Sequence, residues 1–146
     1  MNYEIKENIL TVGDYIRLIE SVGWSHDAEA ILDAALRRSI VTAALVLDGE
    51  IVGMGRMVGD GVVMCYIQDV IVMPEYQRKG FGSAIVKYLL NYIKKHGMNG
   101  ATVNVDLFTS KDRAGFYEKL GFTKRPYDDN GAGMHQFIKI DEGDYI

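Results

Sequence analysis

The stretch VIVMPEYQRKGFGSAIVKYLL, Val70–Leu90, decides how this chain is interpreted. An apolar run typical of a strand leads through Pro74 into a basic turn that contains Gly80 and Gly82, and apolar residues then recur at helical spacing. Backbone N–H groups at the beginning of a helix can bind an anion, and glycine allows phosphate oxygens to approach closely. The pattern indicates a phosphate site at Gln77–Ser83, with an ordinary glycine-containing loop as the alternative.

Two common phosphate loops do not match this turn. In GFGSAI, Ile85 stands where the dinucleotide-binding fingerprint requires its third glycine. No Gly-Lys-Ser/Thr sequence follows, as a nucleoside triphosphate loop would require. The turn is therefore predicted to bind a phosphate ligand of another kind.

The whole chain has the composition of one ordinary folded domain, which we expect to span residues 1–146. Of its 146 residues, 48% are hydrophobic and 25% are charged, which excludes disordered, collagen-like and coiled-coil classes. The net charge of -4 argues against a broad basic face that binds nucleic acid. Cys65 cannot form an intrachain disulfide, and its apolar surroundings predict a buried structural thiol.

Neither a targeting segment nor a metal site is indicated. The N-terminal sequence MNYEIKENIL lacks the pattern of a signal or transit peptide, and no apolar run reaches the roughly 20 residues that span a bilayer. We therefore expect a cytoplasmic protein without membrane contacts. The histidines show no spacing typical of metal ligands, so no metal is expected.

Hydrophobic periodicity predicts one strand, two helices and then three strands in the first half of the chain. A strand is expected at 3–7, and helices are expected at 11–23, capped by Thr11, and at 25–39, capped by Ser25. The segment 42–73 has β-branched and apolar runs that are broken by the hairpin-turn dipeptides Asp48-Gly49 and Asp60-Gly61. This segment therefore predicts three antiparallel strands.

The second half continues with mixed elements. The apolar stripe after the glycine-rich turn predicts a helix that ends near His96. Further along, we expect a strand at 101–108, a helix at 111–121, and two strands at 121–125 and 134–140.

Two motifs in the chain are family hallmarks when they occur together. DVIVMPEYQRKGFGSAIV, at 69–86, combines a strand, a proline, a Gln/Arg-x-x-Gly-x-Gly/Ala loop and a helix, and FYEKLGF follows at 116–122. Both motifs, and the order of elements over essentially the whole chain, resemble the GNAT superfamily of acyl-CoA-dependent N-acetyltransferases. The resemblance implies an α+β fold with a GNAT-like central, twisted, mostly antiparallel sheet of about seven strands and helices on both faces.

The resemblance implies that acetyl-CoA is the cosubstrate. In GNAT proteins the backbone amides of this loop hold the pyrophosphate of coenzyme A, and the loop residues here are Gln77, Arg78, Lys79, Gly80, Phe81, Gly82 and Ser83. The preceding strand is expected to offer backbone groups to the pantetheine arm near Val70, Ile71 and Val72. Many relatives carry Asn where this chain has Ser110, which puts a side-chain contact to the cofactor in doubt.

The resemblance also implies candidates for proton transfer. Tyr117 is expected to be the general acid, because a phenol with a pKa of roughly 10 can protonate a leaving thiolate whose conjugate thiol has a pKa of roughly 8.5. Packing as an ordinary core residue is the alternative for Tyr117. Asp69 stands where some relatives place an acidic base, and the alternatives are a carboxylate paired with a cation and a chain of water molecules.

The function implied by the resemblance is N-acetyl transfer from acetyl-CoA to a primary amine, on a small molecule or a lysine side chain, by direct attack in a ternary complex. Candidate acceptor contacts are Trp24, Tyr66, Asp69, Asp128 and Asp129, with a core position as the alternative for Trp24. The alternative function is a non-catalytic acyl-CoA-binding sensor. The identity of the acceptor and the oligomeric state, a homodimer included, are left open.

Overall fold

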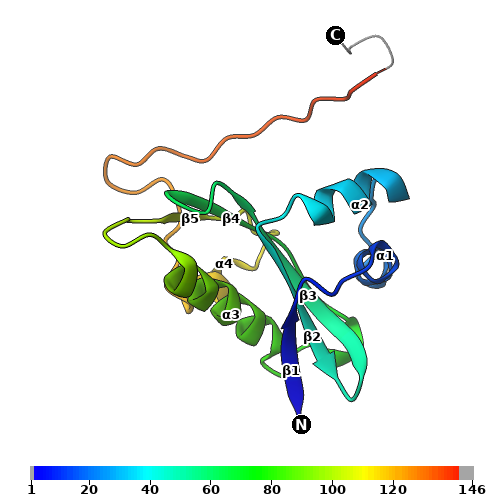
Figure 1. Ribbon diagram of the computed structural model, residues 1–146. Coiled ribbons are helices and arrows are strands. Elements are labelled where there is room, and N and C mark those ends of the chain that lie inside the picture. The colour runs from blue at the N-terminus through cyan, green and yellow to red at the C-terminus, as the bar shows by residue number, and fades with distance from the viewer. Residues whose placement is uncertain (1, 142–146) are drawn as a thin grey trace. The chain divides into compact units, whose positions relative to one another are not determined.

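The computed structural model describes residues 2–141. The chain divides into two compact units, Met1–Thr109 and Ser110–Ile146, and each is described by itself. The first unit contains a sheet and three longer helices, and the second contains one short helix (Figure 1). The expected single domain stays a prediction.

The first unit is built on a five-stranded sheet whose spatial order follows the chain. The strands are β1 (Tyr3–Glu7), β2 (Val41–Leu47), β3 (Glu50–Gly59), β4 (Met64–Val72) and β5 (Asn104–Asp106). All neighbouring strands are antiparallel except β4 and β5, which are parallel. The mixed α+β class and the mostly antiparallel sheet are confirmed, whereas the described residues form five strands and not about seven.

The two predicted hairpin turns explain how β2, β3 and β4 come to be neighbours. Asp48 and Gly49 adopt left-handed φ angles of 50° and 80°, as a tight turn between twisted strands requires. At the second turn, Oδ1 of Asp60 accepts hydrogen bonds from the amides of residues 62, 63 and 64 at 2.7, 2.9 and 3.0 Å. These bonds lower the pKa of Asp60.

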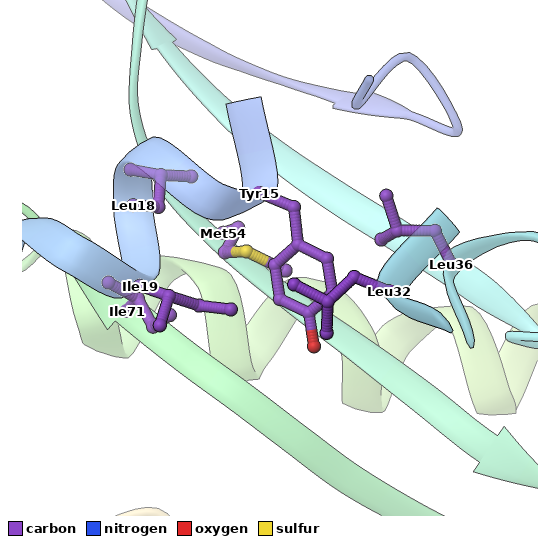
Figure 2. Close-up of a cluster of buried hydrophobic side chains, with 7 residues drawn as sticks. All are labelled: Tyr15, Leu18, Ile19, Leu32, Leu36, Met54 and Ile71. Carbon is purple, nitrogen blue, oxygen red and sulfur yellow. The ribbon is translucent and has the colours of Figure 1, made fainter. Parts of the chain in front are cut away.

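Helices cover both faces of this sheet (Figure 1). On one face lie α1 (Val12–Ser21) and α2 (Glu29–Arg37), which form a buried cluster with the sheet. Figure 2 shows the members of this cluster, which are Tyr15, Leu18, Ile19, Leu32, Leu36, Met54 and Ile71. On the other face lies α3 (Phe81–His96), whose buried residues include Ile85 and Leu89.

Glycines in β3 allow α3 to lie close to the sheet. A Cβ atom at Gly55 would be 2.7 Å from Cγ2 of Ile85, and one at Gly53 would be 3.1 Å from Cδ1 of the same residue. A side chain at Gly55 would force Ile85 to move, because real Cβ atoms essentially never come closer than 3.0 Å, and one at Gly53 would require a smaller shift of the same residue. Met54, between the two glycines, points to the opposite face and joins the cluster of α1 and α2.

The beginnings of α1 and α2 differ in how they are capped. Thr11 accepts a hydrogen bond from the amide of Asp14, and the Asp14 carboxylate accepts one from the amide of Thr11, so the predicted cap is confirmed as a capping box. The predicted cap at Ser25 is wrong, because α2 begins after Ala28, which makes no side-chain cap bond. The first residues of α2 are exposed, and its first buried residue is Leu32.

The second unit contains the short helix α4 (Ala114–Glu118) and an isolated bridge between Tyr127 and Asn130. The strands expected at 121–125 and 134–140 are wrong for the described residues, which have no strand there. A strand requires a hydrogen-bonded neighbour, and an apolar pattern alone does not supply one. No helix of the described part of the chain is long and apolar enough to cross a membrane.

Candidate functional site

The predicted phosphate loop connects β4 to α3 through a tight turn. A short 3₁₀ helix, η1 (Pro74–Tyr76), follows the strand, and Gly80 precedes α3 as its N-cap with a φ of 85°. Arg78 also has a left-handed φ of 63°, which is uncommon for a residue with a side chain. Alternating backbone conformations of this kind turn successive N–H groups toward one side and form an anion-binding concavity.

The N–H groups of this turn are available to a ligand. Among the described residues, the amides of residues 78–83 donate no hydrogen bond, and the first to do so is that of Ala84, to the carbonyl of Gly80 at 3.0 Å. Arg78 and Lys79 are exposed, and the first turn of α3 contains no acidic residue. This combination of free donors and positive charge suits an anion at the helix N-terminus.

Gln77 holds the loop to the end of β4 and is not a free donor. Its side-chain amide donates to the carbonyl of Val72 at 2.8 Å, and its backbone N–H donates to the carbonyl of Pro74 at 3.3 Å. Phe81 likewise has a structural side chain, because its ring is buried and lies edge-on to Tyr3 with centroids 5.3 Å apart. The available amides therefore begin at Arg78.

The strand before the loop has an open backbone along one side. The parallel ladder between β4 and β5 ends where Tyr66 pairs with Asp106. From Ile67 to Val72, β4 has no strand partner on that side among the described residues, although β3 pairs with it on the other. Backbone N–H and C=O groups along this open edge can bind an extended ligand.

A β-bulge interrupts β4 where it pairs with β3. Arg56 pairs with Gln68, but Met54 pairs with Ile71, so β4 contains one extra residue at this point. Asp69, within this irregular step, has a φ of 56°. Beyond the bulge, side chains change faces, because one extra residue reverses the alternation of a strand.

The predicted pantetheine residues follow this reversal. Val70 and Val72 point toward α3, since their Cγ2 atoms lie 3.7 and 3.5 Å from where Cβ atoms at Gly55 and Gly53 would be. Ile71 is buried in the opposite cluster with α1 and α2. Beyond the bulge, Ile71 is thus buried and Val70 and Val72 are half-buried, so the open edge of β4 presents mainly backbone groups to a ligand.

Asp69 is bound by two donors from different elements. Oη of Tyr15, on α1, and Nε of Arg56, on β3, both donate to Oδ2 of Asp69, the latter at 2.8 Å. The Arg56 guanidinium also lies 5.7 Å from the centre of the Tyr15 ring and donates to Oγ of Ser39 at 3.3 Å. Asp69 is thus paired with a cation, which was the alternative to its role as a base.

The two oxygens of Asp69 have different surroundings. Oδ2 accepts both hydrogen bonds, whereas Oδ1 accepts none among the described residues. No buried side-chain oxygen or nitrogen of the described residues lacks a hydrogen bond, so Oδ1 is not fully buried. Burial, and then the hydrogen bond to Asp69, raise the pKa of Tyr15, so that its hydroxyl remains a proton donor. Figure 2 shows this hydroxyl at the end of the ring remote from α1.

The sequence reasoning did not identify Tyr15 and Arg56 as partners of Asp69. Tyr15 lies in the segment 11–23, which predicts a helix, and Arg56 lies in GMGRMVG, between apolar residues of a predicted strand. A charged residue in such a position is a usable signal, because a buried cation requires a carboxylate or a similar partner.

Three further candidates from the sequence lie in the first unit. Trp24 is 46% exposed, so it is not a core residue. The hydroxyl of Tyr66 accepts a hydrogen bond from the amide of Phe108 at 3.1 Å, and the two rings meet edge-on with centroids 5.6 Å apart. Cys65 is buried as predicted, and burial raises the pKa of its thiol.

The candidates of the second unit are Tyr117, Ser110, Asp128 and Asp129. The ring of Tyr117, on α4, lies edge-on to Phe116 and Phe122 with centroids 4.9 and 5.9 Å away. Ser110, Asp128 and Asp129 are exposed. No group of three or more His, Cys, Asp or Glu residues that could hold a metal ion occurs within the part of the chain that the structure describes.

Comparison of the sequence with known proteins gives the same family as the two sequence motifs. Residues 11–122 match the model of the Acetyltransferase (GNAT) family. The chain is 31% identical over 137 residues to GCN5-related N-acetyltransferase 2, chloroplastic, of Arabidopsis thaliana, which covers 80% of this chain and 52% of that protein. It is also 31% identical over 121 residues to serotonin N-acetyltransferase 2, chloroplastic, of Oryza sativa subsp. japonica, with 80% and 58% covered. The chain thus spans little more than half the length of these curated relatives.

The fold has solved relatives as well. The structure of an acetyltransferase, a GNAT family protein from Streptococcus pneumoniae TIGR4, is similar with a TM-score of 0.76 and 31% sequence identity, over 96% of this chain and 98% of that one. This likeness covers the open mixed sheet and the helices described above. Because the family model matches most of the chain and its sequence and structural relatives agree, the chain belongs to the GNAT family of acetyltransferases.

Proposed function

We propose that the chain transfers an acetyl group from acetyl-CoA to a primary amine, on a small molecule or a lysine side chain, by direct attack in a ternary complex. The observation that carries this proposal is the set of unpaired N–H groups at residues 78–83, at the N-terminus of a helix without an acid in its first turn. The pyrophosphate of coenzyme A is an anion of the kind that such a group of donors binds.

The residues of the first unit fit the cofactor in three respects. The amides of residues 78–83, with Gly82 and Ser83 among them, would bind the pyrophosphate, and the exposed Arg78 or Lys79 would reach the 3'-phosphate. The open edge of β4 at Val70 and Val72 would bind the pantetheine arm through backbone groups, whereas Ile71 pairs with Met54 and its carbonyl faces β3. The carbonyl of Val72 already accepts a hydrogen bond from the Gln77 side chain. Any contact between Val72 and the pantetheine arm is therefore assigned to the N–H group of Val72.

Acetyl-CoA would supply the thioester, and the chain would manage the protons. Tyr117 Oη would donate a proton to the sulfur as the bond between carbon and sulfur breaks. The amine nitrogen forms the new bond to the acetyl carbon and then loses a proton. Oδ1 of Asp69, which accepts no hydrogen bond among the described residues, would hold the amine or take this proton, directly or through water.

The exposed ring of Trp24 and the carboxylates of Asp128 and Asp129 support a cationic amine with aromatic character as the acceptor. The rice relative is named for serotonin, an amine of this class. We retain the sequence-based proposal of a cytoplasmic location, although the names of both curated relatives specify the chloroplast.

The test is thiol release from acetyl-CoA in the presence of an arylalkylamine, a polyamine, an aminoglycoside or a lysine peptide. We expect turnover with at least one of them, fastest with the arylalkylamine. Calorimetry with acetyl-CoA alone distinguishes the enzyme from the alternative function, a non-catalytic acyl-CoA-binding sensor. Binding without turnover on any amine would favour the non-catalytic sensor, and the absence of binding would contradict the cofactor assignment.

A further inference from the structure

Asp69 has a left-handed backbone conformation, which is uncommon for any residue with a Cβ atom, although Asp and Asn adopt it more often than most. A φ of 56° costs a residue with a Cβ atom about 1 kcal/mol, and such a conformation persists when the surrounding structure determines it. Asp69 lies in a strand, where the ladder itself favours an extended backbone. Another interaction must therefore hold the residue in the left-handed region.

The donors to Oδ2 are suited to hold this conformation. Tyr15 and Arg56 reach the same oxygen from a helix and from the neighbouring strand, so they fix the carboxylate from two directions. The side chains of Arg56 and Asp69 are only 12% and 11% exposed, and Tyr15 is 3% exposed, so water competes little for these bonds. Hydrogen bonds to a charged group in such surroundings are among the stronger ones in proteins.

The bulge that Asp69 occupies decides the orientation of the residues that follow. If β4 lost its extra residue, the alternation of the strand would send Val70 and Val72 toward α1 and Ile71 toward α3. The backbone N–H and C=O groups along the open edge would shift by the same step. Neither Tyr15 nor Arg56 forms a hydrogen bond with residues 77–83 among the described contacts, so any effect on cofactor binding would pass through Asp69.

We propose that Tyr15 and Arg56 are positioning residues of the acetyl-transfer site, which hold Oδ2 of Asp69 and thereby fix the bulge that presents the backbone of Val70 and Val72 to the cofactor. This inference rests on the proposed function, in which that backbone binds the pantetheine arm. It also couples α1, through Tyr15, to the strand that binds acetyl-CoA in that proposal.

The decisive comparison replaces Asp69 in two ways. Asn is tolerated in the left-handed region and can still accept hydrogen bonds from Tyr15 and Arg56, so Asp69→Asn should retain the bulge. Asp69→Ala removes the acceptor and keeps the strain. We expect the backbone amide NMR signals of Val70–Val72 in the free protein to stay near their wild-type positions in Asp69→Asn and to shift in Asp69→Ala.

The donors are tested by Tyr15→Phe, which keeps the ring, and by Arg56→Lys, which keeps the charge but not the position of Nε. Each should shift the same amide signals and weaken acetyl-CoA binding, measured by calorimetry, by roughly tenfold, because a hydrogen bond to a charged group is lost. Tyr88→Phe is the matched control, since Oη of Tyr88 donates to Glu7 at 2.6 Å outside this cluster. It should change neither the signals nor the affinity.

The outcomes separate this inference from the proposed function. Unshifted signals of Val70–Val72 in folded Asp69→Ala would overturn it, and if that variant does not fold, unshifted signals in Tyr15→Phe and Arg56→Lys would do so. Shifts that spread equally over the amides of β2 would also overturn it, because they would report a general loss of packing. If the wild type does not bind acetyl-CoA, the proposed function fails, and the NMR comparison still decides whether the two donors fix the bulge.

Discussion

At the scale of single residues, the burial of Tyr15 has a consequence for stability at alkaline pH. Its pKa is raised above the ordinary value of about 10, first by burial and then by the hydrogen bond to Asp69. The neutral phenol therefore contributes its full stabilisation below about pH 10, and this contribution is lost as the pH rises from there toward the raised pKa. We expect this group to lower the free energy of unfolding by up to about 1.4 kcal/mol per pH unit in that range.

Urea unfolding at about pH 9 and about pH 11 measures this effect. Tyr15→Phe should be less stable than the wild type at the lower pH, and the difference should shrink at the higher pH because the variant has no phenol to ionise. A difference that stays constant or grows with pH would contradict the assignment of the raised pKa to Tyr15.

Tyr117 gives a second prediction at this scale. Tyr117→Phe retains the ring that contacts Phe116 and Phe122, and it removes the hydroxyl that would protonate the leaving thiolate. We expect kcat at saturating acetyl-CoA to fall by roughly 10²- to 10⁴-fold, with little change in thermal stability. Tyr127→Phe, in the same unit, is the control and should keep kcat. A Tyr117→Phe variant with full kcat would restore the interpretation of Tyr117 as a packing residue.

Local residue roles could be predicted from the sequence, but roles that depend on distant partners could not. The Thr11 cap involves residues three positions apart, and its pattern is visible in the chain. Tyr15 and Arg56 are 54 and 13 positions from Asp69, so their meeting depends on strand register and on the bulge. No residue type specifies that register by itself.

At the scale of elements, the loop between β4 and α3 carries the prediction that tests the cofactor site most directly. Gly80→Asp would place a carboxylate among the free N–H groups and repel a pyrophosphate. A Cβ atom at Gly80 would meet no atom within 4 Å, so packing should be unaffected, and the φ of 85° adds a strain of about 1 kcal/mol. We expect calorimetry to show no binding of acetyl-CoA to a protein that remains folded.

Gly49→Asp is a closely matched control for this variant. Gly49 lies in the turn between β2 and β3, with a φ of 80° and equally open surroundings for a Cβ atom. The Gly49→Asp substitution therefore adds the same charge and a similar backbone strain at a position without a proposed ligand contact. If Gly49→Asp weakened acetyl-CoA binding as much as Gly80→Asp, the loss would reflect strain or net charge and not a phosphate site.

The elements that could be predicted are those bounded by clear turn sequences. The dipeptides Asp48-Gly49 and Asp60-Gly61 delimit β2, β3 and β4, and the glycine-rich turn delimits the beginning of α3. The segments 121–125 and 134–140 have apolar patterns but no strand in the described residues. The bulge was not predicted either, because Asp adopts left-handed φ angles more often than most residues but its type alone does not distinguish a turn from a bulge within a strand.

At the scale of the whole molecule, the hydrophobic core is unevenly distributed. The buried hydrophobic residues of the described chain all lie between Tyr15 and Leu89, within the first unit. Chains of fewer than roughly 40 residues rarely fold alone, and the unit Ser110–Ile146 is shorter than that. Tyr117, the proposed general acid, belongs to this second unit. The sequence predicted one domain, and the cooperativity of unfolding is what tests that prediction.

We expect scanning calorimetry of the full chain to show one transition with equal calorimetric and van't Hoff enthalpies, because the second unit has no buried core of its own among its described residues. Acetyl-CoA at about 100 times its Kd should raise the free energy of unfolding by about 2.7 kcal/mol and move the whole transition to higher temperature. Gly80→Asp should unfold in one transition that acetyl-CoA does not move. Two transitions in the wild type, of which acetyl-CoA moves only one, would show that the units unfold separately and would overturn the single-domain prediction.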